Sequence, residues 1–129
     1  MTRQSFMTYA AAVSILSGLA ALLAPAQLGA VFGMSLDDVA VSEGRLLGAA
    51  YLGYAAIVWF ARDVTDPAAV RAIALGNGVS WAISAIITAV VIASGLAGTQ
   101  AWLLVAVEAA FAAAWTSFTL TERTMVARG

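Results

Sequence analysis

The sequence predicts an all-α integral membrane protein, a four-transmembrane-helix bundle that forms a single domain over residues 1–129. The first observation is composition: 63% of the residues are hydrophobic and 10% are charged, and the mean hydropathy is +0.95. An average soluble domain is about 45–50% apolar and about 25% charged. Because a small domain leaves much of its surface exposed, a chain of this length cannot hide so much apolar surface in water.

The second observation is that the apolar residues fall into four runs of membrane-spanning length. A spanning helix needs about 20 apolar residues, with a range of about 17–25. The predicted helices cover residues 6–24, 44–61, 68–94 and 101–120. Their Ala and Leu content favours helix. They also lack the alternating pattern of barrel strands, which recurs over segments of about 10 residues.

The connections between the runs carry the boundary signals. Pro25 interrupts the first run, and the polar turn at residues 62–67 closes the second. Asp66 is expected to cap the third helix, with Pro67 at its first position. The long connection at residues 25–43 is interpreted as a short interfacial helix and a turn, after which Ser35 or Asp37 caps the next helix.

Residues 1–27 also resemble a secretory signal peptide, because an Arg and an apolar stretch precede Ala-Pro-Ala. Pro25 sits awkwardly beside the potential cleavage point. We therefore expect this segment to be retained as the first span.

Arginine placement predicts the orientation. With the N-terminus inside, one side of the membrane carries five of the six basic residues and the other side carries only Arg45. The five are Arg3, Arg62, Arg71, Arg123 and Arg128. Because basic residues in short loops accumulate on the cytoplasmic side, both termini are expected in the cytoplasm. The predicted location is the inner (plasma) membrane, with multiple passes.

Composition also limits the chemistry. The chain has no Cys, His or Lys and a net charge of −1, so it offers no thiolate, no imidazole base and no basic surface for nucleic acid. No phosphate-binding or nucleophile motif is present, since the Gly-x-Gly at 76–78 lies inside a predicted span. The expectation is a protein that is not an enzyme and that has no cofactor and no metal site.

Glu108 is the one ionisable residue well inside an apolar run. A charge at the centre of a membrane helix costs about 2.5–3.5 kcal/mol or more, and it usually faces the bundle interior or a cavity. Counted from the predicted helix ends, Glu108 and Tyr51 lie at a similar depth below the outer membrane surface, and Ser84 is near them. Arg45 lies at the outer end of its helix, and its long side chain can reach inward. We therefore expect Arg45, Tyr51 or both to bond Glu108.

Three roles for Glu108 stay open at this stage. The first role is structural, in which Glu108 fixes the register of the helices. The second is a proton or cation site, or the polar end of a small-ligand pocket. The third is a contact with a partner. Asn77, between two glycines, is expected to hydrogen-bond between helices rather than to bind a substrate, although it stays a ligand candidate together with Glu108, Arg45, Tyr51 and Trp81. Trp81 and Phe111 lie deep, and either pack the core or line a pocket.

Small residues recur at four-residue spacing on every span, and such stripes let helix backbones approach closely. They are expected to form the seams of the bundle rather than a contact between copies. The stripes are Ala10, Ser14 and Gly18; Gly44 and Gly48, with Ala49 and Gly53 beside them; Gly76, Ser80, Ser84 and Thr88; and Ala106, Ala110 and Ala114.

Residues 23–53 contain Leu23-Ala-Pro25, then Phe32-Gly33-Met34-Ser35-Leu36-Asp37, then Arg45-Leu46-Leu47-Gly48-Ala49 and Gly53. This stretch resembles a family of small bacterial four-span proteins of unknown function, with a DoxX-like layout. The likeness covers the first two spans well and the last two only in layout. It implies the same four-helix fold in a bacterial membrane, and it implies no activity.

Two function classes follow from the sequence. One is a non-enzymatic accessory or structural subunit, with the lipid bilayer and a larger membrane complex or a homo-oligomer as partners. The other is a small transporter or binder of an apolar or lipid-like ligand that uses Glu108. A bundle in which Glu108 is fully paired favours the first class, and an opening that reaches Glu108 favours the second.

Overall fold

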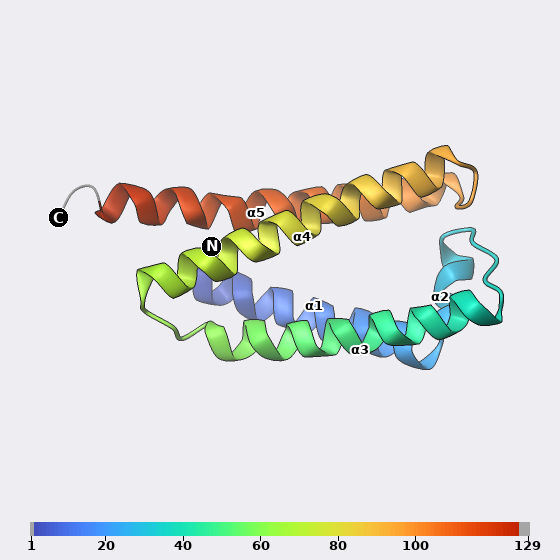
Figure 1. Ribbon diagram of the computed structural model, residues 1–129, viewed down its shortest axis with the longest axis horizontal. Coiled ribbons are helices and arrows are strands. Elements are labelled where there is room, and N and C mark those ends of the chain that lie inside the picture. Colours follow the sequence, from blue (N-terminus) through green and yellow to red (C-terminus); the bar gives the residue numbers. More distant parts are fainter. Residues whose placement is uncertain (1, 127–129) are drawn as a thin grey trace. The chain divides into compact units, whose positions relative to one another are not determined.

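The computed structural model describes residues 2–126, and side chains as far as residue 119. In chain order, the elements are α1 (Arg3–Leu23), α2 (Pro25–Val31), α3 (Asp38–Ala61), α4 (Pro67–Ala93), the 3-10 helix η1 (Thr99–Ala101) and α5 (Trp102–Val126) (Figure 1). Among the described residues, the protein has four helical segments that are long and apolar enough to cross a membrane, which confirms the predicted all-α, four-span fold.

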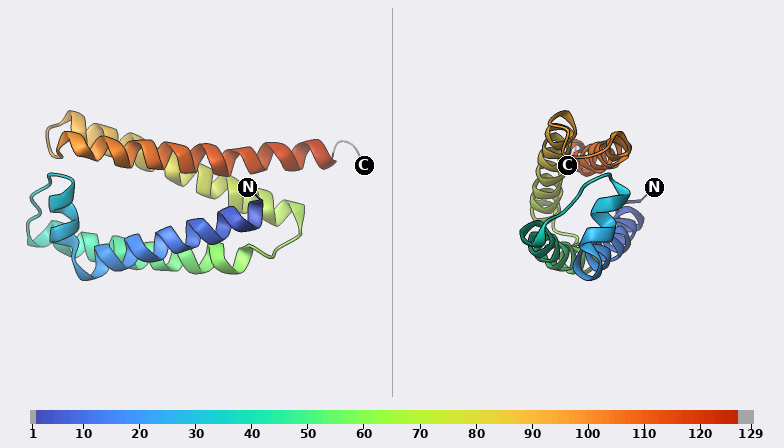
Figure 2. Two further views of the ribbon diagram at one scale, coloured as in Figure 1. Left: turned by 180° about the vertical axis from the view of Figure 1, so that it is seen from behind. Right: turned by 90° about the vertical axis from the view of Figure 1, so that its right-hand side faces the viewer.

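The chain divides into two compact units, Met1–Asp63 and Val64–Gly129. The first contains α1 and α3, which pack against each other and are joined through α2; we call it the first hairpin. The second hairpin contains α4 and α5, joined through η1. In the views of Figures 1 and 2, the two long helices of each hairpin run side by side in opposite directions.

Side-chain caps fix where the helices begin. The Thr2 hydroxyl accepts a hydrogen bond from the Ser5 backbone N–H at 3.2 Å, which starts α1. The Asp66 carboxylate accepts from the backbone N–H groups of Ala68 and Ala69 at 3.3 and 3.1 Å, and Pro67 is the first residue of α4, as predicted. Each cap satisfies N–H groups that have no partner inside the helix.

Helix α3 begins at Asp38, six residues before the predicted start at residue 44. The Asp37 carboxylate accepts from the Ala40 N–H at 2.8 Å, and Asp38 lies in the first turn, where the helix dipole favours negative charge. The prediction placed the start at the edge of the apolar run, whereas the cap decides it. Helix α5 likewise continues to Val126, past the predicted end at residue 120, because polar residues do not by themselves end a helix.

Two glycines end helices in the left-handed conformation. Gly33 (φ 72°) follows α2, and Gly95 (φ 73°) follows α4. After Gly95, the Leu96 N–H bonds to the Val91 carbonyl at 3.1 Å, which closes the helix end as in a Schellman motif. These turns start the two connections that reverse the chain.

A glycine contact brings the two helices of the first hairpin close together. A methyl group placed on Gly48 would lie 2.6 Å from the Leu22 backbone nitrogen and 2.7 Å from the Gly18 carbonyl oxygen. The predicted stripes containing Gly18 and Gly48 therefore do meet at a helix seam. By contrast, a methyl group on Gly53 or Gly76 would meet no atom within 4 Å, so these two glycines do not serve a close approach.

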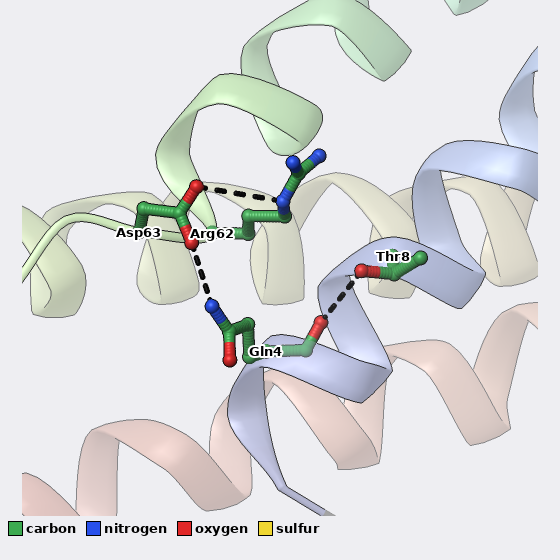
Figure 3. A network of polar contacts seen from close by, with 4 residues as sticks. All are labelled: Gln4, Thr8, Arg62 and Asp63. Atoms are coloured by element: carbon green, nitrogen blue, oxygen red, sulfur yellow. Dashed lines mark hydrogen bonds and ion pairs between the residues drawn. The ribbon is translucent and has the colours of Figure 1, made fainter.

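Polar contacts close the opposite end of the first hairpin (Figure 3). The Gln4 side-chain amide donates to Asp63 Oδ1 at 2.6 Å and so ties the start of α1 to the end of α3. Arg62 Nε lies 3.5 Å from Asp63 Oδ2, and the Arg62 guanidinium carbon lies 3.6 Å from the centre of the Trp59 ring. One carboxylate and one indole therefore hold the Arg62 cation.

The glycine contact predicts different outcomes for two matched substitutions on α3. Gly48→Ala forces a methyl group against backbone atoms that cannot swing away, so we expect it to lower the stability of the folded protein by about 1–3 kcal/mol. Gly53→Ala fills open space and is expected to be neutral or mildly stabilising, because Ala is the better helix former. Thermal unfolding in a mild detergent measures both, and equal stability of the two variants would contradict the glycine seam.

Candidate functional site

The seam between α4 and α5 combines a close approach with aromatic packing. A methyl group on Gly78 would lie 3.0 Å from the Thr116 hydroxyl oxygen, so the helices are near one another at this level. One turn further along α4, Trp81 stacks on Phe111 of α5, with ring centres 4.8 Å apart and planes at 23°. Both rings are buried.

Glu108 lies in the same seam, one helical turn beyond the aromatic pair. The Ser84 hydroxyl on α4 donates a hydrogen bond to Glu108 Oε1 at 2.6 Å. The side chain is well shielded, since Glu108 is only 7% exposed. Its other oxygen, Oε2, is buried and has no hydrogen-bond partner among the residues that the structure describes. The carboxylate is therefore half satisfied.

A simple symmetry places these residues together. Ser84 and Glu108 are each twelve residues from Leu96, and Trp81 and Phe111 are each fifteen residues from it. In an antiparallel hairpin whose turn centres near Leu96, equidistant residues come side by side. Depth alone predicted Ser84 only as a neighbour of Glu108, whereas this equal spacing is the signal that identifies it as the partner of Glu108.

Arg45 and Tyr51 lie on α3 of the first hairpin, whereas Glu108 belongs to the second. The depth argument for Tyr51 assumed that its helix starts at residue 44. With the start at Asp38, Tyr51 lies about 20 Å along the axis from the first residue of α3, and Arg45 about 10 Å. Glu108 lies about 9 Å along the axis from the first residue of α5. Bonding of Glu108 by Arg45 or Tyr51 stays a prediction.

Asn77 makes a local hydrogen bond. Its side-chain amide donates to the Ile73 carbonyl, one turn earlier on α4, at 2.7 Å. This bond satisfies a buried donor within the helix, where the sequence suggested a bond between helices. The neighbouring Gly76 faces open space, and Gly78 provides the close approach to α5.

The chemistry available at this seam is narrow. Among the described residues, no group of three or more acidic, His or Cys side chains gathers to hold a metal ion. What the seam offers is one carboxylate with an unpaired oxygen, one hydroxyl that supports it and a stacked aromatic pair beside them. An ionised carboxylate accepts hydrogen bonds and attracts cations, and aromatic rings favour apolar or cationic groups.

Comparisons with known proteins add no family to this description: no family model, no curated protein and no solved structure matches the chain.

The bond between Ser84 and Glu108 predicts an energetic coupling. Ser84→Ala removes the donor to Glu108 Oε1, and we expect a loss of about 1–2 kcal/mol in stability, as for other hydrogen bonds between membrane helices. Ser80→Ala, on the exposed side of the same helix, is the matched control and is expected to be neutral. In a double-mutant cycle with Glu108→Gln, purely additive effects of Ser84→Ala would contradict the bond.

Proposed function

We propose that this protein is a non-enzymatic binder of a small amphipathic molecule, which it holds through Glu108 by a hydrogen-bond donor on the molecule's polar head. The observation that carries the proposal is the half-satisfied carboxylate: Oε1 accepts from Ser84, whereas Oε2 is buried without a partner among the described residues. A ligand that donates to Oε2 completes the set of hydrogen bonds at this site.

The energetics favour a binding role over a purely structural one. A buried polar group that lacks a partner costs about 1–3 kcal/mol, and more if it is charged. A carboxylate that served only to lock helix register would gain most from full pairing within the bundle. The unpaired oxygen of Glu108 is therefore better explained by a partner that comes and goes.

The proposed setting is the inner (plasma) membrane of a bacterium, with both termini in the cytoplasm. The resemblance of residues 23–53 to small bacterial four-span proteins supports the choice of membrane. The arginines support the orientation. The Gln4–Asp63 bond brings Arg3 and Arg62 to the same end of the first hairpin, and Arg45 lies toward its other end. Basic residues gather on the cytoplasmic side of membranes.

A structural or accessory subunit is the competing function. A donor on another membrane polypeptide, or on a second copy of this chain, would complete Glu108 equally well. The two functions differ in what accompanies the protein when it is extracted from the membrane, so one experiment separates them.

The test is purification in a mild detergent followed by native mass spectrometry of the wild-type protein and two carboxyl-to-amide variants. Glu108→Gln removes the charge at the site, and Glu43→Gln is the matched control on the exposed start of α3. We expect the wild type and Glu43→Gln to retain a small molecule of defined mass, and Glu108→Gln to lose at least nine-tenths of it.

Two results would contradict the proposal. Identical retained molecules in all three proteins would show that Glu108 holds no ligand. A polypeptide that is retained by the wild type and lost only from Glu108→Gln would assign Glu108 to the accessory function instead.

A further inference from the structure

The basic residues of the second hairpin lie far from Glu108 and Ser84 along the chain. Residues 64–129 contain three basic residues, Arg71, Arg123 and Arg128. Arg71 precedes Ser84 by thirteen residues and Arg123 follows Glu108 by fifteen, which is about 20 Å along a helix axis in each case. Arg71, the basic residue of this hairpin whose side chain the structure describes, is therefore too far along α4 to neutralise this carboxylate.

The hairpin supplies Glu108 with a neutral donor alone. Among the described residues, the Ser84 hydroxyl is the group that bonds the carboxylate, and it leaves Oε2 bare. An ion taken out of water is stabilised chiefly by an opposite charge together with hydrogen bonds. The missing element at this site is a positive charge rather than another neutral donor.

The first hairpin shows how this chain holds a cation. The Arg62 guanidinium lies between the Asp63 carboxylate, with Nε 3.5 Å from Oδ2, and the Trp59 ring, whose centre is 3.6 Å from the guanidinium carbon. The second hairpin has the same two kinds of group, a carboxylate at Glu108 and an indole at Trp81. The segment from Trp81 to Glu108 contains no Arg or Lys.

The aromatic pair lies within reach of a ligand bonded to Glu108. Phe111 follows Glu108 by three residues and Trp81 precedes Ser84 by three, so each ring residue lies about one helical turn from its polar neighbour, a rise of about 4.5 Å between backbone positions. Cations interact favourably with aromatic rings within about 6 Å of the ring centre. Trp81 and Phe111 are 8% and 7% exposed, so the seam beside Glu108 is lined by buried apolar rings.

A divalent metal ion fits this donor set poorly. Magnesium and calcium ions are held by about six or more oxygen atoms. The described residues contain no cluster of three acidic side chains, and aromatic rings beside the carboxylate favour an organic group over a hydrated ion.

We infer that the molecule bound by Glu108 is an organic ammonium ion, a protonated amine on an apolar, preferably aromatic body. The ammonium group bonds Glu108 Oε2, and the body lies against Trp81 and Phe111. This inference rests on the binding function proposed above and specifies the class of its ligand.

The test uses three probes of nearly the same shape: 2-phenylethylammonium, the neutral donor 2-phenylethanol, and propylbenzene. Binding to the purified full-length protein in a mild detergent is measured by isothermal titration calorimetry, with protein-free micelles as the blank. We expect saturable binding of one ammonium ion per chain, binding of the alcohol weaker by tenfold or more, and no saturable binding of propylbenzene. This comparison on the wild type decides the charge question without any variant.

Variants then locate the site. Glu108→Gln is expected to weaken ammonium binding at least tenfold, and Glu43→Gln to leave it unchanged. Trp81→Leu removes the ring and is expected to weaken binding about 2- to 30-fold, the range for a single cation–π contact. Circular dichroism and gel filtration check that each variant is folded.

The outcomes separate this inference from the proposed function. Equal binding of the alcohol and the ammonium ion, both lost in Glu108→Gln, would overturn the ammonium ligand and leave the donor-binding function standing. Ammonium binding that is unchanged in Glu108→Gln would overturn both. Binding that emerges only in Arg45→Gln would show that Arg45 already neutralises Glu108, and would overturn the inference. So would the absence of ammonium binding in every protein.

Discussion

Hydrocarbon offers no hydrogen bonds, and this constraint accounts for most of the structure. Every backbone N–H and C=O group inside a bilayer must find a partner within the protein, which leaves helices as the natural way for these four apolar segments to cross it. The same constraint acts on side chains. Asn77 meets it by bonding to the Ile73 carbonyl of its own helix. One oxygen of Glu108 accepts a hydrogen bond from Ser84, whereas the other has no partner among the described residues. Glu108 is therefore the natural focus for function.

The two hairpins bring their helices together by different means. In the first, Gly18 and Gly48 let the backbones of α1 and α3 nearly touch, and the contacts of Gln4, Arg62 and Asp63 fasten one end. In the second, the close approach at Gly78 is followed by an aromatic stack and then by a buried carboxylate. The first hairpin buries the polar side chain of Ser14, whereas the second places a carboxylate, a hydroxyl and two rings within about two helical turns of one another.

Much of the fold could be predicted from the sequence because its determinants are local. The length of each apolar run, the proline at 25 and the Asp66-Pro67 start of α4 each depend on a few neighbouring residues. The start of α3 was misplaced because the apolar run and the helix do not begin together: the Asp37 cap begins the helix six residues before the run.

The site was predicted in part. Glu108 stood out because an ionisable residue in an apolar run is rare, and Trp81 because of its depth. The pairing of Glu108 with Ser84 depends on the register of two helices, which depth alone does not give. The equal spacing of both residues from Leu96 predicts their pairing, once the turn between the helices is known to centre there. For the same reason, the predicted distance of Tyr51 from the start of its helix was too short.

The most direct measurement of the central claim is the distance between the Glu108 carboxyl carbon and the nitrogen of a bound ammonium ion. The sequence has three glutamates, Glu43, Glu108 and Glu122, so carboxyl-¹³C-glutamate labelling gives a simple solid-state NMR spectrum in lipid bilayers, and Glu108→Gln assigns the relevant signal. With ¹⁵N-labelled 2-phenylethylammonium, an ion pair at Glu108 predicts a carbon–nitrogen dipolar contact at this residue within about 4 Å, the range of an ion pair. No contact at Glu108 under saturating probe, or contact confined to the other two glutamates, would contradict it.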